Sequence, residues 1–391
     1  IAITLQKKYL KTWVLLNLKT TKIQVLVILS YNLLQIFIIN SKMGLNIDNR
    51  KIGDNCQPFI IAEMSGNHNL SLERALEIVE AAAKSGAHAI KLQTYTADTL
   101  TLDVNGGDFF INDENSLWKG KNLHELYKQS YTPWEWHKPI MQRAKELGMI
   151  CFSSPFDESA VDFLEELNVP AYKIASFENN YLQLISKVAS TGKTVIISTG
   201  MATISEINDA VTVARDSGCK DLILLKCTST YPATPENSNV LTIPHMRELF
   251  GCEVGISDHT MGVGASIAAV SHGATVIEKH FTLSRSDGGV DSVFSLEPHE
   301  LELLVVETDR AWRSLGRVVY GSTNSEEKSK FFRRSLYISS DVVSGDILTE
   351  NNLRIVRPGM GLEPKYYDMC IGRKVNRDLK KGTALSWEFF A

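Results

Sequence analysis

The feature that most constrains this fold is a series of eight short apolar segments separated by longer segments with helical periodicity. Each apolar run is brief, as strands buried on both faces of a parallel sheet are. Eight strand–helix units predict an α/β fold, a closed (β/α)8 TIM barrel. A doubly wound open sheet is the alternative, but no Gly-x-Gly-x-x-Gly turn follows the first run. The expected strands are residues 58–64, 89–94, 149–154, 171–176, 194–199, 221–228, 252–257 and 275–281.

The chain is 391 residues long, which leaves room for more than a barrel. Residues 1–42 begin with Ile1 and differ in composition from the rest, so we interpret them as a non-native upstream extension before Met43. A membrane anchor is the alternative, because residues 23–40 are apolar although polar side chains interrupt them. We expect the barrel over residues 43–320, a polar linker over 321–332 and a small β-rich domain over 333–391.

Composition excludes some classes of function. The formal net charge is -4, which provides no basic surface for a nucleic acid partner. The six cysteines are scattered, with no Cys-x-x-Cys pair, which favours reduced thiols and a cytoplasmic protein over a disulfide framework or a zinc ribbon.

Two histidines lie at the carboxyl ends of the last two expected strands. His259 follows the run 252–257, and His280 lies near the end of the run 275–281. Polar residues at these strand ends meet on one face of a barrel, so two imidazoles there could hold a divalent metal with open positions for substrate. The alternative interpretation is two unrelated histidines, one in a loop and one packed beneath it. Asp258, beside the first histidine, is a candidate partner of a metal ligand.

Two lysines interrupt apolar strands. Lys91 and Lys173 would be costly to bury unless each meets an anion, and serines accompany them at the strand ends. We interpret them as the site of a small, multiply charged ligand such as a phosphorylated acid. Structural ion pairs with Glu63 or Glu178 are one alternative, and a Schiff-base lysine is another. Both glutamates are also acid–base candidates.

The connection over residues 95–131 is unusually long for a barrel. It carries paired glycines and several aromatic residues, which favours an active-site lid or a subunit contact.

These segments together resemble the sialic acid synthase family over residues 47–391. Each motif is weak by itself, but eight in order at strand ends are specific. Two further blocks, SLWKG (116–120) and YTPWEWHKP (131–139), are similar to the pseudaminic acid synthase branch. The tail resembles that family's C-terminal antifreeze-like (SAF) domain. The eight motifs are IAEMSGNHN (61–69), IKLQT (90–94), SSPF (153–156), YKIASFE (172–178), STGM (198–201), KCTSTYP (226–232), GISDHT (255–260) and EKHFT (278–282).

The resemblance implies a reaction. Phosphoenolpyruvate would condense with the aldehyde of an open-chain acetamido sugar, giving a nine-carbon 2-keto acid and phosphate by C–O cleavage. In the pseudaminate branch the sugar is 2,4-diacetamido-2,4,6-trideoxy-altrose. N-acetylneuraminate or legionaminate synthesis, with the same chemistry on another acetamido sugar, is the alternative. A domain-exchanged homodimer is also implied.

The resemblance also implies roles for individual residues. His259 and His280 would hold a divalent metal, Mn²⁺ or Mg²⁺. The residues with catalytic roles would be Glu63, Glu178, Asp291 and Arg357, the last acting in the other subunit. The substrate-binding residues would be Lys91, Gln93, Ser154, Lys173, Ser176, Ser198, Ser229, Tyr231 and Ser257.

One residue departs from the family pattern. Ser229 stands where sialic acid synthases typically carry Asn, which disfavours N-acetylmannosamine as the substrate. Two other classes remain as alternatives: an aldolase that uses Lys173 as a Schiff base, and a non-catalytic ice- or carbohydrate-binding protein. The charged residues of the tail, such as Lys380 and Lys381, disfavour a flat ice-binding face.

Overall fold

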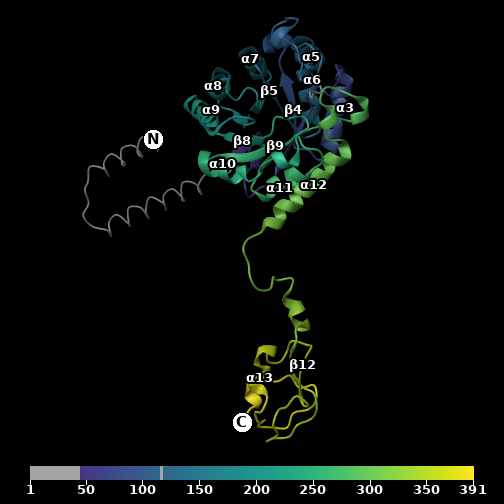
Figure 1. Ribbon diagram of the computed structural model, residues 1–391, viewed down its shortest axis with the longest axis vertical. Helices are drawn as coiled ribbons and strands as arrows, with labels where there is room; N and C mark the ends of the chain where they lie inside the picture. Colours follow the sequence, from purple (N-terminus) through teal and green to yellow (C-terminus); the bar gives the residue numbers. More distant parts are fainter. Residues whose placement is uncertain (1–44, 115–117) are drawn as a thin grey trace, which may run out of the picture. The chain divides into compact units, whose positions relative to one another are not determined.

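The computed structural model describes residues 45–114 and 118–391 (Figure 1). The interpretations of residues 1–42, as an extension or an anchor, lie outside the described residues. The described chain divides into two compact units, the first ending at Gly316 and the second spanning Arg317–Ala391. No helix in the described part of the chain is long and apolar enough to cross a membrane.

The first unit is a closed barrel of eight parallel strands, which confirms the predicted fold class. The strands pair in sequence order, and the last pairs with the first, so His280 and Glu63 are register partners at the seam. The strands are β3 (Phe59–Glu63), β4 (Ala89–Thr94), β5 (Ile150–Pro155), β6 (Ala171–Ile174), β7 (Thr194–Ser198), β8 (Leu222–Cys227), β9 (Glu253–Ser257) and β10 (Val276–His280).

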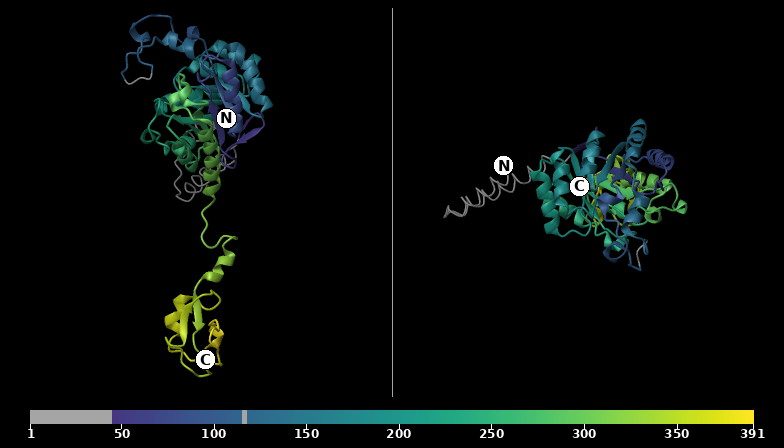
Figure 2. Two further views of the ribbon diagram at one scale, coloured as in Figure 1. Left: turned by 90° about the vertical axis from the view of Figure 1, so that its right-hand side faces the viewer. Right: turned by 90° about the horizontal axis from the view of Figure 1, so that it is seen from above.

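Helices surround the barrel, as the views from other sides show (Figure 2). Several begin at the residue types that cap helices: Ser71 accepts from the Arg74 backbone, and Thr203 forms a capping box with Glu206. The outer helices are α3 (Leu72–Lys84), α6 (Trp134–Glu146), α7 (Glu158–Glu166), α8 (Leu182–Ser190), α9 (Ile204–Asp216), α10 (Thr242–Phe250), α11 (Gly264–Ser271) and α12 (Pro298–Leu315).

A short hairpin precedes the barrel. Strands β1 (Leu45–Ile47) and β2 (Arg50–Ile52) pair antiparallel, and their apolar side chains join those inside the barrel. Phe59 and Ile61 of β3 belong to the same buried cluster, which lies toward the amino ends of the strands. The polar carboxyl ends therefore stand on a packed apolar base.

The long connection after β4 is partly helical. It contains α4 (Ala97–Leu100), a 3-10 turn at Gly107–Phe109 and α5 (Leu123–Ser130) before α6 begins. Asn122 caps α5 by accepting from the His124 backbone N–H at 2.8 Å.

The second unit is small and rich in short strands and turns. Strands β11 (Ser335–Ile338) and β12 (Leu353–Val356) pair antiparallel, and a short helix, α13 (Tyr367–Cys370), follows them. Its own buried core includes Leu336, Leu353 and Leu385.

The approach of β9 to β10 requires glycine at one position. A Cβ on Gly255 would lie 2.1 Å from the Val276 carbonyl oxygen, a distance that no side chain can accept. We predict that Gly255→Ala lowers the free energy of unfolding by roughly 3 kcal/mol or more, through overpacking. Gly264→Ala is the matched control, because nothing lies within 4 Å of a Cβ there. Equal urea midpoints for the two variants would contradict this account.

Candidate active site

A cavity of about 340 Å³ opens among the carboxyl ends of the strands. Ser154 and Ser229 do not line the cavity themselves but contact residues that do. Ser154 Oγ accepts from Lys91 at 3.2 Å, and Ser229 Oγ donates to Ser176 at 2.8 Å. Arg357 lies in the second unit, after β12. The other predicted site residues all line the cavity: Glu63, Lys91, Gln93, Lys173, Ser176, Glu178, Ser198, Tyr231, Ser257, His259, His280 and Asp291.

The two histidines lie together, with ring centroids 5.3 Å apart. His259 Nδ1 is 2.9 Å from the Thr228 carbonyl oxygen, so this nitrogen carries a proton. Burial lowers the pKa of His259, but the hydrogen bond and charge of Cys227 outweigh burial and raise it. His280 Nδ1 is buried without a hydrogen-bond partner among the described residues, and burial holds the pKa of His280 well below its usual range. Two imidazoles this close together can act as ligands of a divalent transition metal when both are neutral.

The loop that carries His259 is held by a buried ion pair. Lys279 Nζ lies 3.1 Å from Asp258 Oδ2 and donates to the carbonyl of Thr260 at 2.6 Å. Asp258 also accepts from Ser266 at 2.7 Å. Asp258 therefore shapes the loop, whereas the sequence suggested that it contacts a metal ligand.

Four buried charges form the floor of the cavity. Lys91 Nζ lies 2.5 Å from Glu63 Oε2 and 4.0 Å from Glu278 Oε2, and Lys173 Nζ lies 3.3 Å from Glu278 Oε1. Lys91 thus makes the ion pair with Glu63 that the sequence left open as an alternative. Lys173 pairs with Glu278 and not with Glu178.

Glu278 was missing from the predicted site residues. It accepts from Ser257 Oγ at 2.9 Å and balances both lysines. Strand alternation could have identified it, because Glu278 and His280 are two residues apart and so share the inner face of β10.

The surroundings shift the pKa values of the cavity carboxyl groups in different directions. Burial raises the pKa of Glu63, and Lys91 opposes that shift only in part. Burial also raises the pKa of Glu178 to about 7. Burial acts in the same direction on Glu278, but Lys173 and Lys91 outweigh it and hold its pKa below the usual range. Carboxyl groups with separated pKa values can act as acid and base at neutral pH.

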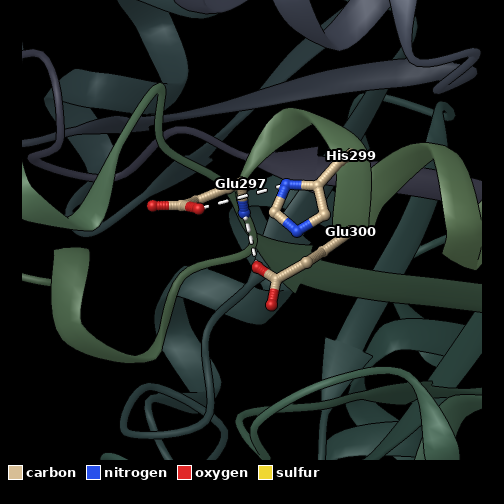
Figure 3. Close-up of side chains that lie close together, drawn as sticks. All are labelled: Glu297, His299 and Glu300. Atoms are coloured by element: carbon tan, nitrogen blue, oxygen red, sulfur yellow. Dashed lines mark hydrogen bonds and ion pairs between the residues drawn. The ribbon is translucent and has the colours of Figure 1, made fainter.

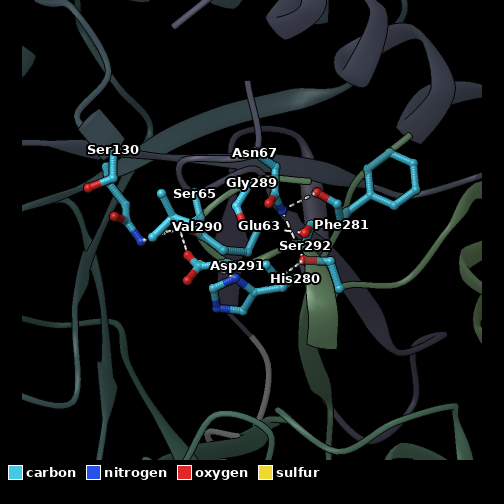
Figure 4. Close-up of polar contacts among 12 residues, drawn as sticks. Glu63, Ser65, Asn67, Ser130, His280, Phe281, Gly289, Val290, Asp291 and Ser292 are labelled. Atoms are coloured by element: carbon cyan, nitrogen blue, oxygen red, sulfur yellow. Dashed lines mark hydrogen bonds and ion pairs between the residues drawn. The ribbon is translucent and has the colours of Figure 1, made fainter. Parts of the chain in front are cut away.

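A hydrogen-bonded chain joins Glu63 to the loop after β10 (Figure 4). Gln93 Nε2 donates to Glu63 Oε1 at 2.9 Å and to Ser65 Oγ at 3.3 Å. Ser65 Oγ in turn donates to Asp291 Oδ2, and the same oxygen lies 3.8 Å from His280 Nδ1.

The opposite side of the cavity is apolar. Side chains of the connection after β4 form much of it. The indole N–H of Trp118 donates to the Val290 carbonyl at 3.2 Å, which joins this connection to the loop after β10. The apolar and aromatic residues contributed by the connection are Tyr95, Leu100, Ile111, Trp118, Leu123, Leu126 and Tyr127.

A second cluster of possible metal ligands lies at the start of α12, where Glu297, His299 and Glu300 converge (Figure 3). Arg285 already contacts both carboxylates, and Glu300 also accepts from the Glu297 backbone N–H at 2.9 Å. Because these groups cap the helix and neutralise an arginine, we assign them a structural role.

A barrel with a polar cavity at the carboxyl ends of its strands has the architecture of a TIM-barrel enzyme. Comparison with known proteins agrees: residues 78–320 match the NeuB family and residues 333–391 match the SAF domain. The chain belongs to the NeuB family, whose synthases condense phosphoenolpyruvate with a sugar.

Three relatives illustrate this membership. The chain is 44% identical to a pseudaminic acid synthase of Campylobacter jejuni, over 84% of this chain and 95% of the relative. It is 42% identical to one of Helicobacter pylori, over 84% and 96%. A crystal structure of N-acetylneuraminic acid synthetase from Leptospira borgpetersenii, in complex with citrate, superposes with a TM-score of 0.65. That structure is 32% identical and covers 73% of this chain and 95% of its own.

The charge balance of the floor leads to a prediction about stability. Glu278→Gln should lower the free energy of unfolding by roughly 3 kcal/mol, because it leaves two buried lysines with a single carboxylate. The control is Glu178→Gln, whose carboxylate has a buried oxygen without a partner among the described residues. Chemical denaturation at several pH values measures both.

The control has a pH dependence of known sign. The folded-state pKa of Glu178 is raised from 4.5 to about 7, so its contribution to stability is complete below pH 4.5 and is lost as the pH rises through 7. Glutamine stays neutral, so Glu178→Gln should gain stability relative to the parent chain over this range. Equal denaturation midpoints for the two variants at pH 7 would contradict the proposed charge balance.

Proposed function

We propose that this chain is a pseudaminic acid synthase. It condenses phosphoenolpyruvate with 2,4-diacetamido-2,4,6-trideoxy-altrose and water, giving pseudaminic acid and phosphate. The observation that carries the proposal is the convergence of two lysines, two histidines and four acidic side chains on one cavity, in a chain 44% identical to a protein of that name. The free cysteines favour a reducing compartment, and we place the enzyme in the cytoplasm.

The polar floor supports phosphoenolpyruvate binding. Lys91 and Lys173 supply positive charge, and serine hydroxyls surround them. Ser198 Oγ is buried without a hydrogen-bond partner among the described residues, so it is available to a ligand oxygen. Because the lysines are desolvated and already held by carboxylates, their ammonium groups are preorganised for the anion. Ser176 and Ser257 complete this set of donors.

The apolar wall supports the choice of sugar. A 6-deoxy sugar ends in a methyl group, and its two acetamido groups end in methyl groups as well. Leu100, Ile111 and Leu123 offer a surface for such groups. Each buried methyl-sized group stabilises binding by about 0.8 kcal/mol. A hydroxyl at the same place would have to find a hydrogen-bond partner there.

His259 and His280 would hold the divalent ion, Mn²⁺ or Mg²⁺, beside the aldehyde. Such an ion, when bound, polarises a carbonyl oxygen as a Lewis acid. Glu178, Tyr231 and Asp291 line the same cavity and would contact the sugar or move protons.

The covalent steps follow from this arrangement. C3 of phosphoenolpyruvate attacks the aldehyde carbon, and the aldehyde oxygen takes a proton. Positive charge develops at C2, where Glu63 stabilises it and directs the water that adds there. The water loses its proton, and the C2–O bond to phosphate breaks to give the 2-keto acid and phosphate. The raised pKa of Glu63 suits a group that must accept a proton near neutral pH.

The purified protein should form product only with phosphoenolpyruvate, the proposed sugar and a divalent metal. Mass spectrometry and phosphate release measure this, with N-acetylmannosamine and the legionaminic acid precursor as competing substrates. An ¹⁸O label in the bridging oxygen of phosphoenolpyruvate should appear in phosphate.

EDTA should abolish turnover and Mn²⁺ should restore it. Covalent labelling of Lys173 by pyruvate and borohydride would instead identify an aldolase, and faster turnover of another sugar would reassign the substrate.

We also propose that two subunits share each site, with Arg357 of one acting in the cavity of the other. Arg357→Ala should lower kcat by a factor of about 100, with the melting temperature unchanged, because it removes a charged contact to the reacting groups. Glu63→Gln should also be inactive while still binding phosphoenolpyruvate. A mixture of the two inactive variants should recover up to about a quarter of the activity by forming one intact site per mixed dimer. No recovery after subunit exchange, or a monomer by light scattering, would contradict the shared site.

A further inference from the structure

Ser65 occupies a backbone conformation that serine rarely adopts. It follows β3 directly, and its φ is 48°, in the left-handed region that favours glycine. The side chain is 4% exposed and lines the cavity. A non-glycine residue in this region carries a steric cost, and such residues persist where the surroundings require them. A glycine would satisfy the turn, so the hydroxyl group needs a separate explanation.

The hydroxyl lies between two acidic groups of the cavity, Glu63 and Asp291. The hydroxyl oxygen accepts from Gln93 Nε2 at 3.3 Å, and the hydroxyl group donates to Asp291 Oδ2. Gln93 Nε2 also donates to Glu63 Oε1 at 2.9 Å. In Figure 4 the Asp291 carboxylate lies between Ser65 and the His280 ring. The hydroxyl therefore ties the Asp291 carboxylate to the start of the barrel.

The loop that carries Asp291 depends on such ties. Gly289 lies two residues before Asp291 and has a φ of 135°. A Cβ on Gly289 would lie 2.9 Å from Asn69 Oδ1. The Asp291 carbonyl oxygen accepts from Ser295 Oγ at 2.7 Å, which fixes the backbone. The carboxylate itself has one hydrogen-bond donor among the described side chains, Ser65, and this bond uses one of its two oxygens. The orientation of the second oxygen toward a ligand thus follows from Ser65.

We propose that Ser65 is a positioning residue that fixes the Asp291 carboxylate for the sugar substrate. This inference rests on the proposed function. Ser65 acts through Asp291, so its loss should matter only while Asp291 is present. We attribute the retained backbone strain at Ser65 to its hydroxyl group, which contacts both Gln93 and the Asp291 carboxylate.

The test uses Ser65→Gly, which keeps the left-handed backbone without steric cost and removes the hydroxyl. We expect kcat with the proposed sugar to fall about tenfold, as the loss of one charge-assisted hydrogen bond implies, while KM for phosphoenolpyruvate and the melting temperature stay near their original values. Ser65→Ala should lose activity similarly. Asn168→Gly is the matched control: Asn168 also has a positive φ, 53°, but it does not line this cavity, so its kcat should not change.

A double-mutant cycle tests the route of action. In an Asp291→Asn background, adding Ser65→Gly should lower the residual kcat less than twofold. A full tenfold loss in that background would show that Ser65 acts on the substrate directly and would overturn the proposal. Unchanged kcat in Ser65→Gly would also overturn it. If the parent chain turns over none of the sugars, the proposed function fails instead, so the two failures are distinguishable.

Discussion

The site depends on the neutralisation of two lysines inside the barrel. Burying an ammonium group costs several kcal/mol unless charges of opposite sign stand next to it. Here Glu278 lies between Lys91 and Lys173, and Glu63 lies against Lys91, so the floor carries two positive and two negative charges. These four side chains hold one another in place before any substrate arrives. An incoming anion therefore meets donors whose orientation has already been fixed by folding.

Strand alternation creates both the core and this floor. On several strands, inward positions near the amino end are apolar, and the inward positions that follow are polar. In β4, Ala89 belongs to the buried apolar cluster and Lys91 to the charged floor. In β10, Val276 belongs to the apolar cluster and Glu278 to the charged floor. The apolar layers and the hairpin β1–β2 close the barrel below the charges. The charged layer thus faces only the cavity, where the low dielectric strengthens its interactions.

The sequence identified the strands and most of the cavity because both depend on local patterns. Apolar runs marked the strands to within a residue or two, and polar residues after them marked the lining. It did not assign Glu278 a role in the site, since the charge balance depends on side chains from four different strands. Ser65 was also missed, because neither its left-handed φ nor its reach to Asp291, more than two hundred residues away, appears in the local pattern. The hairpin β1–β2 was not predicted, because only its packing against the barrel makes it a hairpin.

The structure constrains the residue type at Ser65 and at Gly255 for different reasons. Gly255 is required by space, since any side chain would displace the Val276 carbonyl and separate the strands that carry the histidines. Ser65 takes a conformation suited to glycine, yet it bears a side chain that contacts an acidic residue of the cavity. Where a residue adopts a backbone conformation that its type disfavours, and the fold is not stabilised by it, we expect a functional contact. By that reasoning the turn after β3 belongs to the site as much as the strand ends do, because it links Glu63 on the first strand with Asp291 after the last.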